Sequence, residues 1–411
     1  MELVEELVRS CPGSSPRLAG AGDAIDGVLP EVVVSPPTSQ DVRAVLGLAA
    51  RRNRTVVARG AGTKLDWGSP PNSADIVVDL SGMNRVLEHA RGDLVARVEA
   101  GAPLATVNRQ LAEGRQWLPV DEVVPGSTIG GVVATGICGP ARYLHGAVRD
   151  LMIGVTVVRA DGVIARSGSK VVKNVAGYDL AKLFTGSYGT LGIVTEATFR
   201  LRPSPPQRRY VTATYPDEAA LEPVLAGVLR SQMAATAIEI QRREPAGDIR
   251  LSVLVEGSSG PVEQRAGVVS AMLDRPAVSE HPPPDWGSLP GPVTLKVTTE
   301  LRSVTALLGL VRQLAAAYEL VPVIGGSAGT GVLFVGLGAG SAPAALAGLL
   351  SDLREGCHRF GGTVIVVRAP AAIKPALDIW GPVPGLELMR RVKAEFDPEG
   401  RLAPGRFVGG I

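Results

Sequence analysis

The spacing of hydrophobic residues changes along the chain, and each spacing predicts a different kind of element. In residues 23–97 short apolar runs, such as the one at 55–58, alternate with helical patterns. One apolar stripe at helical spacing follows Thr38 and Ser39, either of which can cap a helix. We therefore predict a first α/β segment in which strands alternate with helices.

A second segment, residues 118–203, is rich in glycine and in short strand patterns. Residues 151–168 read as two strands joined at Asp161 and Gly162, a dipeptide that favours a tight hairpin turn. The proline-rich stretch at 202–206 follows. Because prolines punctuate elements, we place a domain boundary there.

Beyond this boundary the pattern becomes regular and repeats. The order strand, helix, strand, strand, helix is typical of a ferredoxin-like unit. It occurs first at 209–215, 217–231, 235–241, 251–256 and 262–273, and again at 293–297, 304–318, 321–324, 332–336 and 343–360 with a further strand at 363–367. We predict two ferredoxin-like units side by side, joined through 281–284, and then a last helix at 386–396.

Composition excludes several classes of partner. The 42 Lys and Arg residues nearly balance the 40 Asp and Glu residues, so the net charge of +2 offers no basic face for nucleic acid. The cysteines, Cys11, Cys138 and Cys357, are too far apart for a cluster or zinc motif, and their low number fits a reducing cytoplasm. We expect no metal, since the four histidines are scattered: His89, His145, His281 and His358.

Two stretches without charge, 123–141 and 320–351, are long enough to cross a bilayer. The second contains eight glycines and two prolines, which a lipid-exposed helix tolerates poorly. We expect two short strands and a helix there, and no membrane span.

Three glycine-rich loops carry the candidate chemistry. They lie at 59–63, directly after a predicted strand, at 125–131, and at 186–194, before another strand. Without Cβ atoms, such turns let backbone N–H groups approach a phosphate closely. None of them opens a helix as G-x-G-x-x-G after a first strand, and no P-loop lysine motif is present, which disfavours a nicotinamide-type site.

These loops resemble a known family. The runs ARGAGT, PGSTIGGVVATG and GYDLAKLFTGSYGTLGIVTEATFRL match, in order and spacing, the FAD-binding lobe of the vanillyl-alcohol oxidase superfamily over residues 25–205. Within it, GTKLDWG, VVKNVAGYDLAKL and the closing FDPEGRLAPGRF resemble the FAD-binding subunit of glycolate oxidase. Ala403 stands where many relatives have Asn.

The resemblance implies an α+β fold with a PCMH-type, two-lobed FAD-binding domain and a cap of paired ferredoxin-like units. The expected parts are a lead-in at 1–24, the FAD domain at 25–205 with lobes 25–97 and 98–205, the cap at 206–375, and a helix and tail at 376–411 that return to the FAD domain. The expected function is an FAD-dependent oxidoreductase acting on glycolate or a related 2-hydroxy acid. Implied partners are a larger flavin subunit and an iron–sulfur subunit, and these would supply any membrane association.

Carried over residue by residue, the resemblance implies a set of cofactor contacts. Relatives that bind flavin covalently have histidine where this chain has Thr63, so non-covalent FAD is expected. The implied cofactor-binding residues are Arg59, Gly60, Ala61, Gly62, Thr63, Pro125, Gly126, Ser127, Thr128, Ile129, Gly130, Gly131, Thr135, Gly139, Ala141, Gly189, Gly192, Ile193 and Val194.

Catalytic residues are less well marked. Lys173 and Asn174 are candidates for facing the flavin or an anionic substrate, and a lysine there would stabilise reduced flavin. A solvated lysine is the alternative. His145 lies in a stretch that passes near the cofactor in relatives, although a lone histidine more often packs or faces solvent. Cys138 reads as a small buried thiol rather than a flavin attachment site.

Two other functions remain open from the sequence. One is a free-standing FAD oxidase or dehydrogenase for another alcohol or acid, with the paired units as its substrate lid. The other is a non-catalytic subunit that keeps the flavin fold to build an assembly. The sequence does not name the base that would take the substrate's hydroxyl proton.

Overall fold

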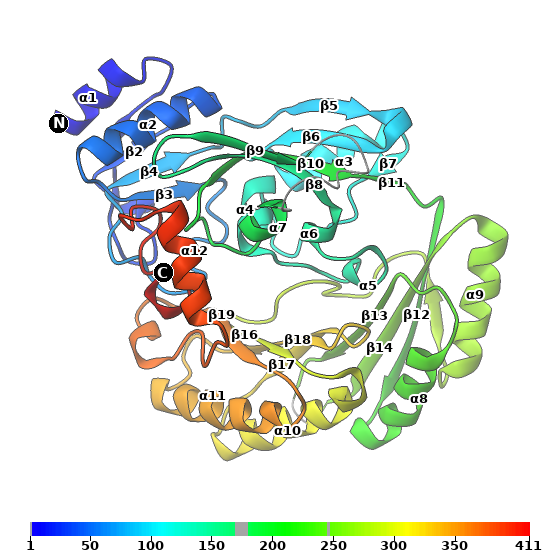
Figure 1. Cartoon of the computed structure of the whole chain (residues 1–411). Coiled ribbons are helices and arrows are strands. Elements are labelled where there is room, and N and C mark those ends of the chain that lie inside the picture. The colour runs from blue at the N-terminus through cyan, green and yellow to red at the C-terminus, as the bar shows by residue number, and fades with distance from the viewer. Residues whose placement is uncertain (1, 169–179, 245–246) are drawn as a thin grey trace. The chain divides into compact units, whose positions relative to one another are not determined.

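The structure, a computed structural model, describes residues 2–168, 180–244 and 247–411. They form two compact units (Figure 1). The first unit comprises Met1–Ile137, Ala147–Ser204 and Pro382–Ile411, and the second comprises Cys138–Gly146 and Pro205–Gly381. The sequence predicts Cys138–Gly146 within the FAD domain at 25–205, whereas in the structure this segment packs with the second unit.

The first unit contains a small sheet in which parallel strands carry the first glycine loop. Its strands lie in the order β1 (Arg17–Leu18), β2 (Val32–Val34), β4 (Ile76–Asp79) and β3 (Val56–Arg59). β2 and β3 are both parallel to β4, which lies between them, as expected when a helix connects the two flanking strands. That helix is α2 (Ser39–Arg51), and Thr38 caps it by accepting the Asp41 amide at 3.2 Å.

A second sheet of the same unit is antiparallel throughout. Its strands lie in the order β5 (Val86–Ala90), β6 (Val95–Glu99), β10 (Ile193–Arg200), β8 (Met152–Val158) and β9 (Ile164–Gly168). The hairpin predicted at Asp161 and Gly162 joins β8 to β9, and Gly162 has the positive φ of +79° that such a turn needs. Before the C-terminal segment, the other α-helices and strands described in this unit are α1 (Glu2–Ser10), α3 (Leu104–Ala112), β7 (Gln116–Trp117), α4 (Ile129–Thr135), α6 (Val148–Leu151), α7 (Leu180–Phe184) and β11 (Arg202–Pro203).

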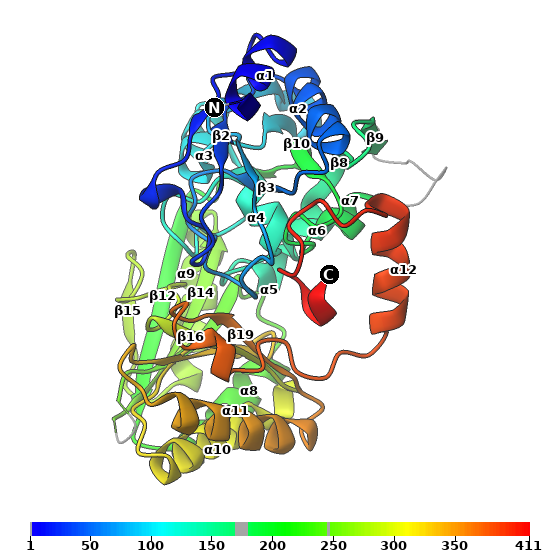
Figure 2. The same cartoon turned by 90° about the vertical axis from the view of Figure 1, so that its left-hand side faces the viewer.

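The C-terminal segment completes the first unit. Helix α12 (Leu386–Phe396) has the bounds that the sequence predicts, and it lies beside α7 (Figure 2), where the Phe184 and Phe396 rings pack edge to face at 5.5 Å. The chain then runs along β3. The Val56 amide donates to the Arg401 carbonyl at 2.8 Å, and the Ala403 amide donates to the Val56 carbonyl at 2.9 Å.

The second unit is built on one eight-stranded antiparallel sheet, formed by two ferredoxin-like repeats. The first repeat contains β12 (Gln207–Tyr215), α8 (Glu218–Arg230), β13 (Ala237–Arg242), β14 (Ile249–Gly257), α9 (Ser259–Met272) and β15 (Ala277–Ser279). The second contains β16 (Val293–Thr298), α10 (Val304–Ala317), β17 (Val323–Ser327), β18 (Val332–Leu337), α11 (Pro343–His358) and β19 (Val364–Arg368). The strand order is β15-β12-β14-β13-β17-β18-β16-β19, so each repeat has its fourth strand outermost and the repeats meet at β13 and β17. The predicted pair of ferredoxin-like units is confirmed.

One face of this sheet is covered by the four long helices (Figure 1). Apolar side chains from β12, β13, β14, β16 and β18 pack with those of the helices into one continuous core. The stretch 320–351 forms β17, β18 and part of α11, which confirms the predicted pair of strands and helix. Among the described residues, no helix is long and apolar enough to cross a membrane.

Candidate functional site

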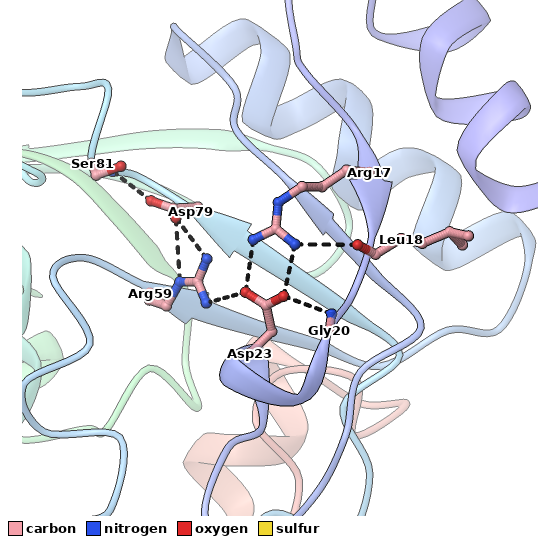
Figure 3. Close-up of polar contacts among 7 residues, drawn as sticks. All are labelled: Arg17, Leu18, Gly20, Asp23, Arg59, Asp79 and Ser81. Atoms are coloured by element: carbon pink, nitrogen blue, oxygen red, sulfur yellow. Dashed lines mark hydrogen bonds and ion pairs between the residues drawn. The ribbon is translucent and has the colours of Figure 1, made fainter.

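The end of β3 is held by a network of ion pairs (Figure 3). The Arg59 guanidinium donates to Asp23 at 2.9 Å and to Asp79 at 2.8 Å, and Arg17 donates to Asp23 at 2.7 Å. Arg59 is largely buried, with a side chain 13% exposed. Its guanidinium is thus occupied by two carboxylates, and its role is to fix the first glycine loop.

The carboxylates of this network are stabilised in their charged form. The Arg17 guanidinium and the Gly20 amide hold the pKa of Asp23 well below its usual range. Burial alone would raise the pKa of Asp79, but hydrogen bonds from Ser81 and Arg59 outweigh burial and lower it. The network therefore remains charged at neutral pH, and only acid would loosen the strand end.

The loop that follows β3 presents a row of unused backbone donors. No hydrogen bond of the described chain uses the amide N–H groups of residues 60–64. The loop lies close against Thr128, since a Cβ atom built on Gly60 would come within 2.2 Å of the Thr128 Oγ1 atom. A glycine is required at position 60 because any other residue would separate these two segments.

The second loop, at 125–131, is predicted from the sequence to offer backbone donors, but in the structure it leads into a helix. Thr128 caps a helix, α4, and the amides of Ile129 and Gly130 donate to the carbonyls of Ala102 and Ala100 at 2.9 and 2.7 Å. The Gly126 amide donates to the Glu122 side chain at 3.1 Å. Most backbone donors of this loop are therefore consumed by the fold, and its contribution to the site is the close-packed surface of α4.

The third loop is tied to α4. The amides of Gly186 and Tyr188 donate to the carbonyls of Val133 and Ala134 at 2.9 and 2.8 Å. Tyr188 and Gly189 have positive φ angles of +56° and +78°. Burial raises the pKa of Tyr188 to about 12, so this hydroxyl is protonated at neutral pH and is unsuited to act as a base.

Two adjoining cavities open between the three loops, and each encloses about 500 Å³ of empty space, counting the part that is open to solvent. Both are bounded by the end of β3, by α4 and by Tyr188. The first cavity is lined by Val57–Leu65, Thr128, Gly131, Ala134, Thr135, Tyr188 and Arg406. The second is lined by Ala58–Gly60, Leu80, Ala100, Thr128, Gly130, Gly131, Ala134, Ser187–Gly189 and Gly192–Val194. Together they form what we call the loop groove.

Two buried cations face the first cavity. Lys64 is 7% exposed, and its Nζ atom donates to Ser127 at 2.6 Å and to Thr63 at 3.1 Å. Burial lowers the pKa of Lys64 to about 8. Arg406 is 3% exposed, and its Nη2 atom donates to the Trp67 carbonyl at 2.9 Å while its buried Nη1 atom has no hydrogen-bond partner in the described chain.

This combination fits the diphosphate of a dinucleotide. A diphosphate needs several donors and compensating positive charge, and both are present on one cavity. Backbone donors come from residues 60–64, and charge comes from Lys64 and Arg406. The second cavity, walled by glycine, alanine and β10, has room for an uncharged part of the same ligand.

Only some of the predicted site residues line the loop groove. The first-loop residues, Thr128, Gly130, Gly131, Thr135, Gly189 and Gly192–Val194 line the loop groove. Gly139, Ala141, Cys138 and His145 belong to the second unit. Lys173 and Asn174 lie outside the described residues. Sequence reasoning missed Lys64, Tyr188 and Arg406 as site residues, although all three stand inside or next to the motifs that it singled out.

Comparison with known proteins agrees with this geometry. Residues 30–168 match the family described as FAD binding domain, and residues 380–407 match the C-terminal domain of FAD linked oxidases. The chain is 27% identical to the glycolate oxidase subunit GlcD of Bacillus subtilis, over 92% of this chain and 89% of that one. It is 36% identical to the glycolate oxidase subunit GlcE of Escherichia coli, over 36% of this chain and 43% of that one.

A solved structure supports the fold. An alkyldihydroxyacetonephosphate synthase superposes with a TM-score of 0.67 and 17% sequence identity, covering 92% of this chain and 76% of that one. At this identity the likeness concerns the architecture alone, and it confirms the predicted fold class. With the FAD binding domain at 30–168 and the C-terminal domain of FAD linked oxidases at 380–407, the chain is an FAD-linked oxidoreductase.

Proposed function

We propose that the chain holds FAD non-covalently in the loop groove and oxidises a small 2-hydroxy acid such as glycolate as one subunit of a larger enzyme. The observation that carries the proposal is the row of unused amides at 60–64, which opens on a cavity with two buried cations. In this proposal the amides and Lys64 hold the diphosphate. FAD, when bound, accepts the hydride that leaves the substrate carbon.

The residues that line the loop groove suggest the remaining contacts to the cofactor. Thr128, Gly131 and Thr135 on α4 line the groove, and their small side chains let a ligand approach the helix. Ile193 and Val194 line its far end at the start of β10. Thr63 lines the first cavity at the position where relatives with covalently bound flavin have histidine, which supports a non-covalent cofactor.

The catalytic residues stay predictions. Oxidation of a hydroxy acid requires a group that takes the hydroxyl proton, and Tyr188 is a poor candidate because its pKa is about 12. Lys173, Asn174 and His145 remain the candidates from the sequence. The proposed assembly would include a larger flavin subunit and an iron–sulfur subunit in the cytoplasm, and support for it comes from the names of the two relatives, both subunits of glycolate oxidases.

Anaerobic reduction of the flavin tests the proposal. The purified chain, loaded with FAD, is mixed with glycolate and with a series of other 2-hydroxy acids, alone and with partner subunits from the same source. Bleaching of the flavin absorbance by a 2-hydroxy acid supports the proposal, and a need for the partners supports a subunit role. Full bleaching by the isolated chain would favour a free-standing enzyme. No bleaching under either condition, with FAD still bound, would favour a non-catalytic assembly subunit.

A further inference from the structure

Arg406 reaches the first cavity from the C-terminal tail, and its guanidinium is incompletely paired. The residue is 3% exposed, and its Nη1 atom is buried without a hydrogen-bond partner among the described residues. Asp26 and Asp66 act on it electrostatically, yet neither forms an ion pair with it in the described chain. Its one described hydrogen bond goes to the Trp67 carbonyl.

A buried guanidinium in this state is an unusual arrangement. Removing a charged group from water is costly unless other charges and hydrogen bonds compensate for the lost hydration. The nearby Tyr188 hydroxyl is neutral at physiological pH and supplies no opposite charge. The guanidinium itself stays protonated, since arginine is not deprotonated in proteins. An anion that enters the cavity would supply the missing partner of the Nη1 atom.

We propose that Arg406 is a binding residue for the diphosphate of FAD, to which its Nη1 group donates a hydrogen bond. The inference rests on the proposed function, since it assumes FAD in the loop groove. A guanidinium is well matched to phosphate because its coplanar N–H groups can donate hydrogen bonds to two phosphate oxygens at once. Arg406 lines the same cavity as the unused amides of 60–64 and the Lys64 ammonium.

The distribution of charge in the groove supports this assignment over a contact to the flavin ring. Lys64 and Arg406, two buried cations that form no ion pair with a carboxylate of the described residues, both line the first cavity. The second cavity has Arg59 in its wall, but Asp23 and Asp79 already neutralise that guanidinium. A doubly charged group is therefore best accommodated in the first cavity, and an uncharged ring in the second.

Because Arg406 lies in the C-terminal tail, a contact between Arg406 and the diphosphate would also affect docking of the tail. The tail that carries Arg406 is joined to the segment that follows the first loop. There the Asn72 amide donates to the Pro404 carbonyl at 2.8 Å, and the Ser69 amide donates to the Arg406 carbonyl at 3.2 Å. A diphosphate bound by the loop and by Arg406 would connect the two segments. Cofactor binding and docking of the tail are thus expected to stabilise each other.

The test uses Arg406→Gln, which removes the charge and keeps a donor for the Trp67 carbonyl. Dissociation constants of the full-length apoprotein are measured for FAD, for ADP, which carries the diphosphate, and for riboflavin, which lacks it. We expect FAD and ADP to bind about 10- to 100-fold more weakly, as for loss of a charge-assisted hydrogen bond, and riboflavin to be unaffected. Arg406→Lys should restore part of the affinity.

Stability separates a binding role from a structural one. Because the guanidinium is buried and incompletely paired in the apoprotein, Arg406→Gln should leave the apoprotein's unfolding midpoint unchanged or raise it. It should reduce only the stabilisation gained on adding FAD. The matched control is Arg401→Gln in the same tail, whose guanidinium lies 4.0 Å from the Glu399 carboxylate. This control should bind FAD and ADP like the wild type.

Several results would overturn the assignment. Unchanged FAD and ADP affinities in Arg406→Gln, an equal loss of riboflavin affinity, or a less stable apoprotein would each contradict it. The proposed function can fail separately: in that case the wild-type protein itself binds neither FAD nor ADP. If the wild type binds both and Arg406→Gln binds them equally well, only the role of Arg406 is wrong.

Discussion

Gly60 is the residue on which the close approach of the first loop to α4 depends. In Gly60→Ala the new Cβ atom would lie 2.2 Å from the Thr128 Oγ1 atom, so the two segments must separate. Such overpacking costs about 1–3 kcal/mol, and we expect FAD affinity to fall by about 10- to 100-fold, measured by titration of the apoprotein. Gly92→Ala is the control, because its Cβ atom would meet nothing within 4 Å. Wild-type affinity in Gly60→Ala would show that the cofactor does not use this contact.

The lowered pKa of Lys64 leads us to expect that cofactor binding depends on pH. Its pKa is about 8 in the unliganded protein, and a bound diphosphate favours the protonated ammonium. Affinity for FAD should therefore decrease as pH rises above about 8, by up to about tenfold per pH unit. In Lys64→Met the affinity is lower and this dependence is lost. An identical pH profile in the two proteins would contradict a role of Lys64 in binding.

The same group has the opposite effect on folding of the apoprotein. The pKa of Lys64 is lowered from its ordinary value of 10.5, so between about 8 and 10.5 the unfolded chain binds more protons at this residue than the folded chain does. The contribution of Lys64 to the free energy of unfolding of the apoprotein therefore rises with pH through that range. Comparison of wild type and Lys64→Met by chemical denaturation isolates this contribution from those of other lysines.

The glycines of the site could be predicted from the sequence, whereas its buried cations could not. The glycines of the first loop were recognisable because a phosphate turn needs them at fixed spacing. Lys64 follows that turn directly, but a lysine next to a loop is usually solvated, and only the packing of Ser127 and Gly131 around it shows that it is buried. The incomplete pairing of the buried Arg406 guanidinium likewise depends on tertiary contacts that no local pattern encodes.

At the scale of elements, the C-terminal tail depends on Asp397. This residue is 1% exposed, and its carboxylate accepts from the Lys393 ammonium at 2.6 Å and from the amides of Leu402 and Arg401 at 2.7 and 3.0 Å. The Lys393 ammonium also donates to the Thr190 carbonyl at 2.8 Å. One carboxylate thus ends α12 and directs the chain back toward β3.

Removing this carboxylate should loosen the tail and weaken cofactor binding together. Asp397→Ala leaves the Lys393 ammonium without its anion, and breaking a buried pair costs about 3–5 kcal/mol in the free energy of unfolding. We expect a comparable loss by chemical denaturation and, in the variant that remains folded, weaker FAD binding. Glu399→Ala, which removes an exposed carboxylate of the same segment, should change neither property. A destabilised variant with wild-type FAD affinity would show that the tail and the cofactor are independent.

The tail also explains a departure from the relatives. Ala403 has a φ of +43°, a left-handed conformation that asparagine tolerates better than alanine. Asparagine, which the family resemblance implies at this position, would fit this backbone. In this chain the alanine is held there by its amide, which donates to the Val56 carbonyl at 2.9 Å.

Elements with regular periodicity were predicted well, and irregular ones were not. The bounds of α12 agree to the residue, and the helices and strands of the second unit agree within a few residues, because their apolar faces pack into one core. The sequence missed β15, an exposed edge strand of three residues without alternation. It also missed α4, since Gly130 and Gly131 inside a helix read as loop residues.

At the scale of the whole molecule, the fold was accessible from the order of elements, whereas one excursion of the chain from the first unit into the second was not. The two repeats each follow the ferredoxin-like order, which the sequence shows directly. The excursion of Cys138–Gly146 into the second unit is different. It arises from tertiary packing of α5 (Arg142–His145) with β13, and the composition does not change at either end of this segment.

The central claim is that the chain binds one FAD without a covalent bond. The protein is purified gently, its absorbance spectrum is recorded, and it is then denatured and separated from small molecules, after which the flavin in each fraction is identified and counted. The account predicts a yellow protein that releases about one FAD per chain into the small-molecule fraction. A colourless protein that also fails to bind added FAD, or flavin that stays attached to the denatured chain, would contradict it.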